Sequence, residues 1–147
     1  MAMSCLFCDE AYLNDEYPAQ VIVSDDTFVI MHPANPDELT YLGTALVVAK
    51  RHIPSFADLH PDEAAALGML LARVARALKA VTGAGHTYTY SFGEGVHHLH
   101  IFVVARYDET PPEYVRLDVE RWPAAPRGDA AAVAALCARL RAELAAG

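Results

Sequence analysis

The fold is most restricted by two neighbouring segments late in the chain. Thr87 to Phe92 alternates polar and aromatic residues, and His97 to Tyr107 is mostly apolar, so each predicts a β-strand. The turn expected at Gly93-Glu94-Gly95 is too short for the crossover connection that parallel strands need. The two strands are therefore predicted to be antiparallel.

The rest of the chain predicts strands followed by helices. Strands are expected at Gln20 to Val23, Phe28 to Met31 and Thr44 to Ala49. A helix is expected to begin at Pro61, because proline fits the first helical position. Its apolar face would consist of Leu67, Leu70, Leu71, Val74 and Leu78. A last helix, from about Ala130 to Ala145, follows the N-cap residue Asp129. This order predicts an α+β fold, with an antiparallel sheet and helices packed on one face.

Composition narrows the class of protein. With 147 residues, 54% of them apolar, the chain is expected to form a single globular domain. A formal net charge of -8 gives no general attraction for nucleic acid or anionic lipid. The N-terminal residues show no targeting pattern, and no run of about 18 apolar residues predicts a membrane span. The odd cysteine count of three then favours a reducing cytoplasm over a disulfide scaffold.

The strand after Gly95 carries two histidines that share a face. Because side chains alternate in a strand, His98, His100 and Phe102 point to one side. Leu99 and Ile101 point to the other, apolar side and are expected to pack on the helices. Two imidazoles on one face suit metal ligation, or a nucleophile with an orienting neighbour, but the polar face of a half-buried strand explains the spacing equally well.

Cys5 and Cys8 have the spacing that lets two thiolates bind one metal ion. Two unrelated thiols, or a redox pair, are the alternatives. A redox-active cysteine pair is expected after a strand, at the start of a helix in a βαβ pattern. The sequence shows no such pattern around Cys5 and Cys8. Cys137 lies among leucines and alanines of the last helix, where a packing role is expected.

In combination, these segments resemble the histidine-triad family. The run GEGVHHLHIFVVARY is similar to that family's signature, a glycine-rich turn leading into His-x-His-x-His and two apolar residues. TALVVAKRHIP resembles the family's apolar strand that ends in a basic residue and a histidine. The resemblance extends from about Cys5 to Tyr107, and the Trp122 to Pro126 loop with the last helix is similar to the tail of one bacterial branch.

The resemblance implies one domain over residues 1–147, with a CxxC segment at 1–10 and a C-terminal loop and helix at 108–147. It implies a five-stranded antiparallel sheet with two main helices, and a homodimer. The middle histidine, His100, would attack the α-phosphorus of a small nucleotide, and His98 is its catalytic partner. Water would then release a nucleoside monophosphate such as AMP or GMP. In branches with a CxxC, a structural zinc ion is held by residues that correspond to Cys5, Cys8, His52 and His98.

Three parts of the family pattern are altered in this chain. Phe102 stands at the third histidine, where loss of a donor costs on the order of 100-fold in rate. Glu94 and Gly95 stand where an amide and a hydroxyl are expected, and Asn35 is the nearest substitute for the acidic residue that binds ribose. His32 lies near the expected base or ribose pocket. The nucleotide-binding candidates are thus His32, Asn35, Glu94, Gly95, Val96 and Phe102. Backbone N–H groups near Val96 are expected to hold the phosphate oxygens.

Three hypotheses for function follow. The first is a phosphohydrolase or nucleotidyl transferase acting on a dinucleoside polyphosphate or nucleoside phosphoramidate through His100. The second is a nucleotide-binding or sensing protein with little turnover, because Phe102 cannot donate a hydrogen bond. The third is a zinc-stapled interaction protein that binds no nucleotide.

Overall fold

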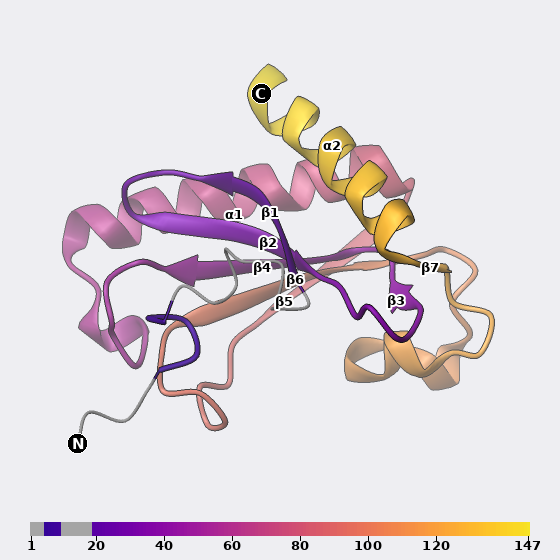
Figure 1. Cartoon of the computed structure of the whole chain (residues 1–147), viewed down its shortest axis with the longest axis horizontal. Helices are drawn as coiled ribbons and strands as arrows, with labels where there is room; N and C mark the ends of the chain where they lie inside the picture. The colour runs from indigo at the N-terminus through magenta and orange to yellow at the C-terminus, as the bar shows by residue number, and fades with distance from the viewer. Residues whose placement is uncertain (1–4, 10–18) are drawn as a thin grey trace.

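Five strands form one antiparallel sheet in the order β1-β2-β4-β6-β5 (Figure 1). The computed structural model describes residues 5–9 and 19–147, so both ends of the CxxC segment expected at 1–10 lie outside the described residues. The strands are β1 (Ala19–Ser24), β2 (Phe28–Pro33), β4 (Thr44–Ala49), β5 (His86–Tyr90) and β6 (His100–Arg106). All four pairings are antiparallel. The sheet predicted from the sequence is confirmed.

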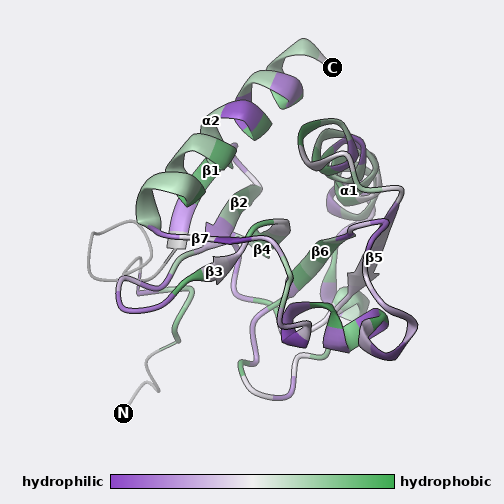
Figure 2. Ribbon diagram, turned by 90° about the vertical axis from the view of Figure 1, so that its right-hand side faces the viewer, coloured by the Kyte–Doolittle hydropathy of each residue, from purple (hydrophilic) through white to green (hydrophobic). Residues whose placement is uncertain are grey.

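Two helices cover one face of this sheet, as predicted (Figure 2). They are α1 (Pro61–Thr82) and α2 (Ala130–Ala146), and both begin where the sequence placed them. Glu63 stabilises the start of α1 by accepting the backbone N–H of His60 at 2.8 Å, and Gly83 ends it with a left-handed φ of 76°. Among the described residues, no helix is both long enough and apolar enough to cross a membrane.

Because side chains alternate along the strands, each face of the sheet has its own apolar core. Leu99, Ile101 and Val103 face the helices and are almost completely buried with them. Cys137 belongs to the same core, and burial raises its pKa to about 11, so it has the packing role expected for it. A second cluster on the opposite face contains Phe7 and is extended by Phe102.

The strand with the histidines begins later than predicted. His97 to Leu99 were expected to belong to it, but β6 starts at His100. The N–H of Leu99 instead donates to the carbonyl of Ile53 at 2.7 Å. The expected tight turn at 93–95 is also wrong, because residues 91–99 form a nine-residue connection between β5 and β6.

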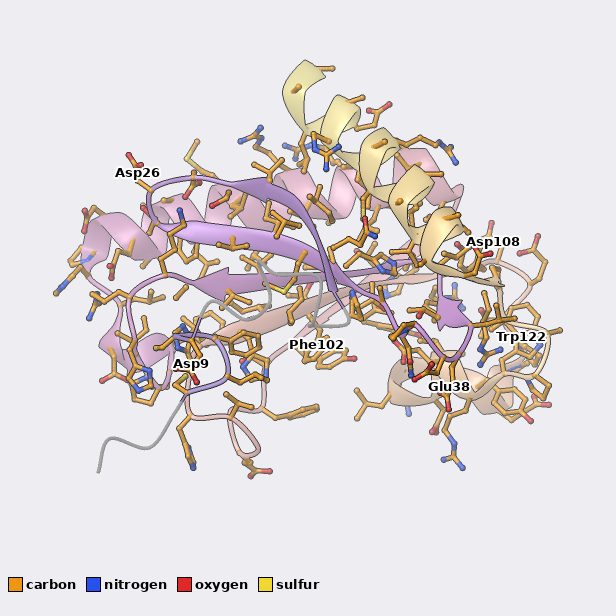
Figure 3. The ribbon with its side chains drawn as sticks, in the orientation of Figure 1. Asp9, Asp26, Glu38, Phe102, Asp108 and Trp122 are labelled. Atoms are coloured by element: carbon orange, nitrogen blue, oxygen red, sulfur yellow. The ribbon has the colours of Figure 1, made fainter. Side chains whose placement is uncertain are left out.

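A small second sheet lies beside the main one and was not predicted. It pairs β3 (Thr40–Tyr41) with β7 (Arg127–Gly128), and short 3-10 helices at 112–114 and 116–121 precede β7. Val119 and Trp122 from this C-terminal loop join a third apolar cluster, to which Phe102 also belongs. Figure 3 shows Phe102 on the side of the sheet away from the helices, between Asp9 and Trp122. Phe102 therefore links the part of this face covered by the cysteine segment to the part covered by the loop that precedes α2.

We expect Asp129→Ala to destabilise the protein by about 1 kcal/mol. The Asp129 carboxylate accepts the N–H of Ala132 at 2.9 Å and caps α2, which packs on the sheet. Thermal unfolding of the variant and the wild type measures the difference. Asp26→Ala, an exposed acid in the β1–β2 turn with no cap to lose, is the control, and an equal shift in both variants would contradict the prediction.

Candidate functional site

His98 is completely buried, with none of its surface exposed. Its Nε2–H donates to the carbonyl oxygen of Ala49 at 2.5 Å. Because a carbonyl can only accept, the proton is on Nε2 and the lone pair is on Nδ1. Burial also lowers the pKa of His98, which favours the neutral form that binds metal ions.

The Nδ1 atom of His98 points into a group of four potential metal ligands. Cys5 Sγ lies 3.4 Å from it, and Cys8 Sγ lies 3.5 Å from it. The Nδ1 atom of His52 lies 3.2 Å from both His98 Nδ1 and Cys8 Sγ. All four ligand atoms are within 4.8 Å of one another. The structure therefore brings together every residue of the predicted metal set.

These spacings fit zinc. Bonds of about 2.3 Å to sulfur and about 2.0–2.1 Å to nitrogen, at tetrahedral angles, put two nitrogens about 3.3 Å apart and a nitrogen and a sulfur about 3.6 Å apart. The observed distances are 3.2 Å and 3.2–3.5 Å. The hydrogen bond from His98 to Ala49 is the kind of outer contact that orients a metal-binding histidine. Two thiolates and two imidazoles leave no open position, so this is the donor set of a structural site.

His100, two residues further on, is half-buried and oriented differently. Its Nδ1–H donates to the backbone carbonyl of His98 at 2.6 Å. The proton is therefore on Nδ1, and the lone pair is on Nε2. Neutral imidazole with a free Nε2 lone pair is a nucleophile.

A family model described as HIT domain matches residues 14–109. This chain belongs to the HIT family. Members of this family bind nucleotides, and the family includes nucleotide hydrolases and transferases.

Solved histidine triad structures share the fold of this HIT chain. A zinc-bound family protein from Mycobacterium smegmatis is 25% identical with a TM-score of 0.68, over 99% of this chain and 96% of that one. A hypothetical histidine triad nucleotide-binding protein from Sulfolobus tokodaii has a TM-score of 0.71 at 18% identity, over 97% of this chain and 93% of that one. A histidine triad protein from Sinorhizobium meliloti has a TM-score of 0.67 at 22% identity, over 86% and 90%.

In this HIT chain, aromatic rings flank the imidazole of His100 from two segments. Phe7 lies between Cys5 and Cys8, and its ring centroid is 5.2 Å from that of His100 and 5.6 Å from that of His98. Phe102 meets His100 edge-on at 5.7 Å. The sequence missed Phe7, because only the fold brings it to a histidine 93 residues away.

Phe102 belongs to an aromatic row and has no polar group for a ligand. Its ring stacks on Tyr90 of β5 at 5.2 Å with an interplanar angle of 18°. Tyr90 in turn lies 5.3 Å from Phe92, whose side chain is largely exposed. Any contact of Phe102 with a ligand is therefore a packing contact rather than a hydrogen bond.

His32 does not join His100. It has no exposed surface, and alternation along β2 puts it on the helix side with Ile30. Its Nδ1–H donates to the Pro33 carbonyl at 2.6 Å, and Nε2 accepts the N–H of Gly43 at 3.2 Å. Burial lowers its pKa, which favours the neutral form. With both nitrogens occupied, His32 is placed as a core residue, which does not fit the predicted ligand contact.

The remaining nucleotide-binding candidates lie on two surface segments. Asn35 is exposed after β2, and its side chain accepts the N–H of Asp37 at 3.0 Å. Glu94 and Gly95 are exposed in the 91–99 connection, and Val96 packs partly against the Phe7 cluster. Within the described residues, the N–H groups of 94–96 donate to no protein acceptor. This connection leads directly into His100.

Ser91 is a second residue that the sequence did not indicate. Its hydroxyl donates to the carbonyl of His100 at 2.6 Å. The last pair of the β5–β6 ladder is Tyr90 with Phe102, so the hydroxyl occupies the place where the next ladder bond would form. Ser91 thus holds the backbone of His100 where the two strands diverge.

Proposed function

We propose that this protein is a nucleotide hydrolase or nucleotidyl transferase in which His100 is the nucleophile. The single observation that supports this most is the hydrogen bond from His100 Nδ1 to the carbonyl of His98. It fixes the tautomer that leaves the Nε2 lone pair available, and β6 holds the ring at the sheet surface.

The reaction would proceed in two displacements. His100 Nε2 attacks the α-phosphorus of a small nucleotide, forming a phosphorus–nitrogen bond as the bond to the leaving group breaks. The leaving group departs with the bonding electron pair and takes a proton from solvent. Water then attacks the same phosphorus and loses a proton to solvent, the phosphorus–nitrogen bond breaks, and its electron pair returns to Nε2. The product is a nucleoside monophosphate of the AMP or GMP type.

The charge on the phosphate would be balanced by backbone donors rather than by a cluster of cations. The unpaired N–H groups of residues 94–96 are of the type that binds phosphate oxygens. Glu94 is exposed beside them and is expected to turn its carboxylate toward solvent, since it would repel a phosphate at close range.

His98 would support catalysis through its backbone. Both of its ring nitrogens are engaged, one with Ala49 and one with the metal ligands, so its carbonyl is the group that meets His100. Cys5, Cys8, His52 and His98 would hold a structural Zn²⁺. The ion would fix the N-terminal segment against the strand that carries the nucleophile.

A second candidate function is nucleotide binding without efficient turnover. Phe102, which the family resemblance places at the third histidine, has no donor for a phosphate oxygen or leaving group. Loss of such a donor costs on the order of 100-fold or more in rate. Its stacking on Tyr90 also ties it to the apolar face.

An assay of AMP release distinguishes the two candidates. The protein is incubated with adenosine 5′-phosphoramidate and, separately, with diadenosine polyphosphates, and AMP binding is measured by calorimetry. We expect AMP release from at least one substrate at catalytic protein concentration. Binding of AMP without turnover would favour the second candidate, and neither binding nor turnover would reject both.

Four further expectations belong to the same proposal. We expect residues 1–147 to act as one domain and the protein to form a homodimer, which sedimentation analysis would measure. A cytoplasmic location agrees with three cysteines that form no disulfide. Nucleic acid is not an expected partner of a chain with a net charge of -8.

A further inference from the structure

Phe7 is the residue through which the cysteine segment contacts the nucleophile. The backbone N–H of Cys8 donates to the carbonyl of Cys5 at 3.0 Å, and so does that of Asp9. This turn places both thiols on the metal cluster and directs Phe7 onto the sheet face. Only 5% of Phe7 is exposed, and it packs with Val29, Met31, Leu46 and Val48.

The Phe7 ring contacts both histidines of the site. It meets His98 at a centroid distance of 5.6 Å and an interplanar angle of 63°, and His100 at 5.2 Å and 44°. The hydrogen bond from His100 to His98 restrains one edge of the imidazole. Phe7, from the cysteine segment, and Phe102, from β6, restrain the His100 ring by packing against it.

We propose that Phe7 is a positioning residue that holds the His100 imidazole in its nucleophilic orientation and links the metal cluster to the nucleophile. This inference rests on the proposed function of His100. Displacing a reacting group by about 1 Å can cost on the order of 100-fold in rate, so a ring that limits rotation of the imidazole affects the chemical step. Phe7 itself touches no reacting atom in this role.

Phe7→Leu tests the proposal, because leucine keeps the apolar packing but lacks the ring. We expect kcat to fall about 10- to 100-fold while KM changes less than about twofold and zinc content stays the same. Phe28→Leu is the matched control, since Phe28 is equally buried but belongs to the helix-side core. It should lower thermal stability and leave kcat within about twofold of the wild type.

An unchanged kcat in Phe7→Leu would overturn the proposal. A higher KM with an unchanged kcat would also overturn it, because Phe7 would then bind the ligand. A loss of zinc large enough to explain the whole fall in kcat would overturn it as well. If Phe7→Leu does not fold, Phe7→Met offers an unbranched side chain of similar volume.

A readout without turnover separates this inference from the proposed function. Long-range ¹H–¹⁵N spectra at one fixed pH report the tautomer of His100. A single Nδ1–H form in the wild type and a mixture in Phe7→Leu would support the positioning role even if no substrate reacts. The same single form in both proteins would overturn it.

Discussion

His100→Ala is expected to lower AMP release by at least about 1,000-fold, because it removes the atom that forms the bond to phosphorus. Within the described part of the chain, Nδ1 of this imidazole donates to His98 and no group bonds to the Nε2 lone pair. Alanine cannot replace it. AMP release is measured under single-turnover and steady-state conditions, and denaturing mass spectrometry of the quenched wild type should show a nucleotidyl adduct on the peptide that contains His100.

The matched control is His97→Ala, which removes an exposed imidazole from the same segment. It should keep turnover within about threefold of the wild type, because surface substitutions away from a site have small effects. Equal activity of His100→Ala and the wild type would reject His100 as the nucleophile. Loss of activity in both variants would assign the effect to the segment rather than to one ring.

Cys8→Ser is expected to abolish zinc binding and so to destabilise the protein, relative to its zinc-bound form, by about 3–4 kcal/mol. This is the stability that a folded protein gains from a ligand that binds only the folded state and is present at about 100 to 1,000 times its dissociation constant. For a chain of this size, it corresponds to a fall of about 10 °C in melting temperature. Cys8 Sγ is within 3.5 Å of both histidine nitrogens, so its loss opens the tetrahedral set. Elemental analysis and calorimetry measure the two effects.

The control for the zinc measurement is Cys137→Ser. Cys137 is buried in the helix-side core, so serine there should lower stability and leave the zinc content unchanged. A chelator added to the wild type should reproduce the Cys8→Ser melting temperature. Retention of one equivalent of zinc by Cys8→Ser would contradict the proposed ligand set.

Local signals in the sequence were sufficient for most of the fold. The strand predicted at Thr44 to Ala49 and the helix starts at Pro61 and Ala130 match the structure, because continuous apolar runs, a proline and an N-cap act over a few residues. The histidine strand was predicted three residues too early. Leu99 bonds to Ile53, and no local pattern reveals that partner.

The residues of the candidate site were likewise predictable only where a local pattern or the family resemblance indicated them. The resemblance named the four residues that the structure brings together as potential metal ligands, and alternation placed His98 and His100 on the face opposite Leu99. His32 was expected near the ligand pocket. Alternation along β2 instead puts its side chain on the helix side with Ile30. Phe7 and Ser91 could not be found in this way, because their roles depend on contacts with β6 that only the tertiary fold creates.

The metal ligands come from three separate parts of the chain, and this determines when zinc can bind. Cys8 and His52 are 44 residues apart, and His52 and His98 are 46 residues apart. The pairing of β4 with β6 brings such distant positions together, and the core beneath these strands contains none of the four candidate ligands. In zinc fingers the ion creates the fold, whereas here we expect the folded chain to create the site. A newly synthesised molecule should therefore fold first and take up its metal ion afterwards.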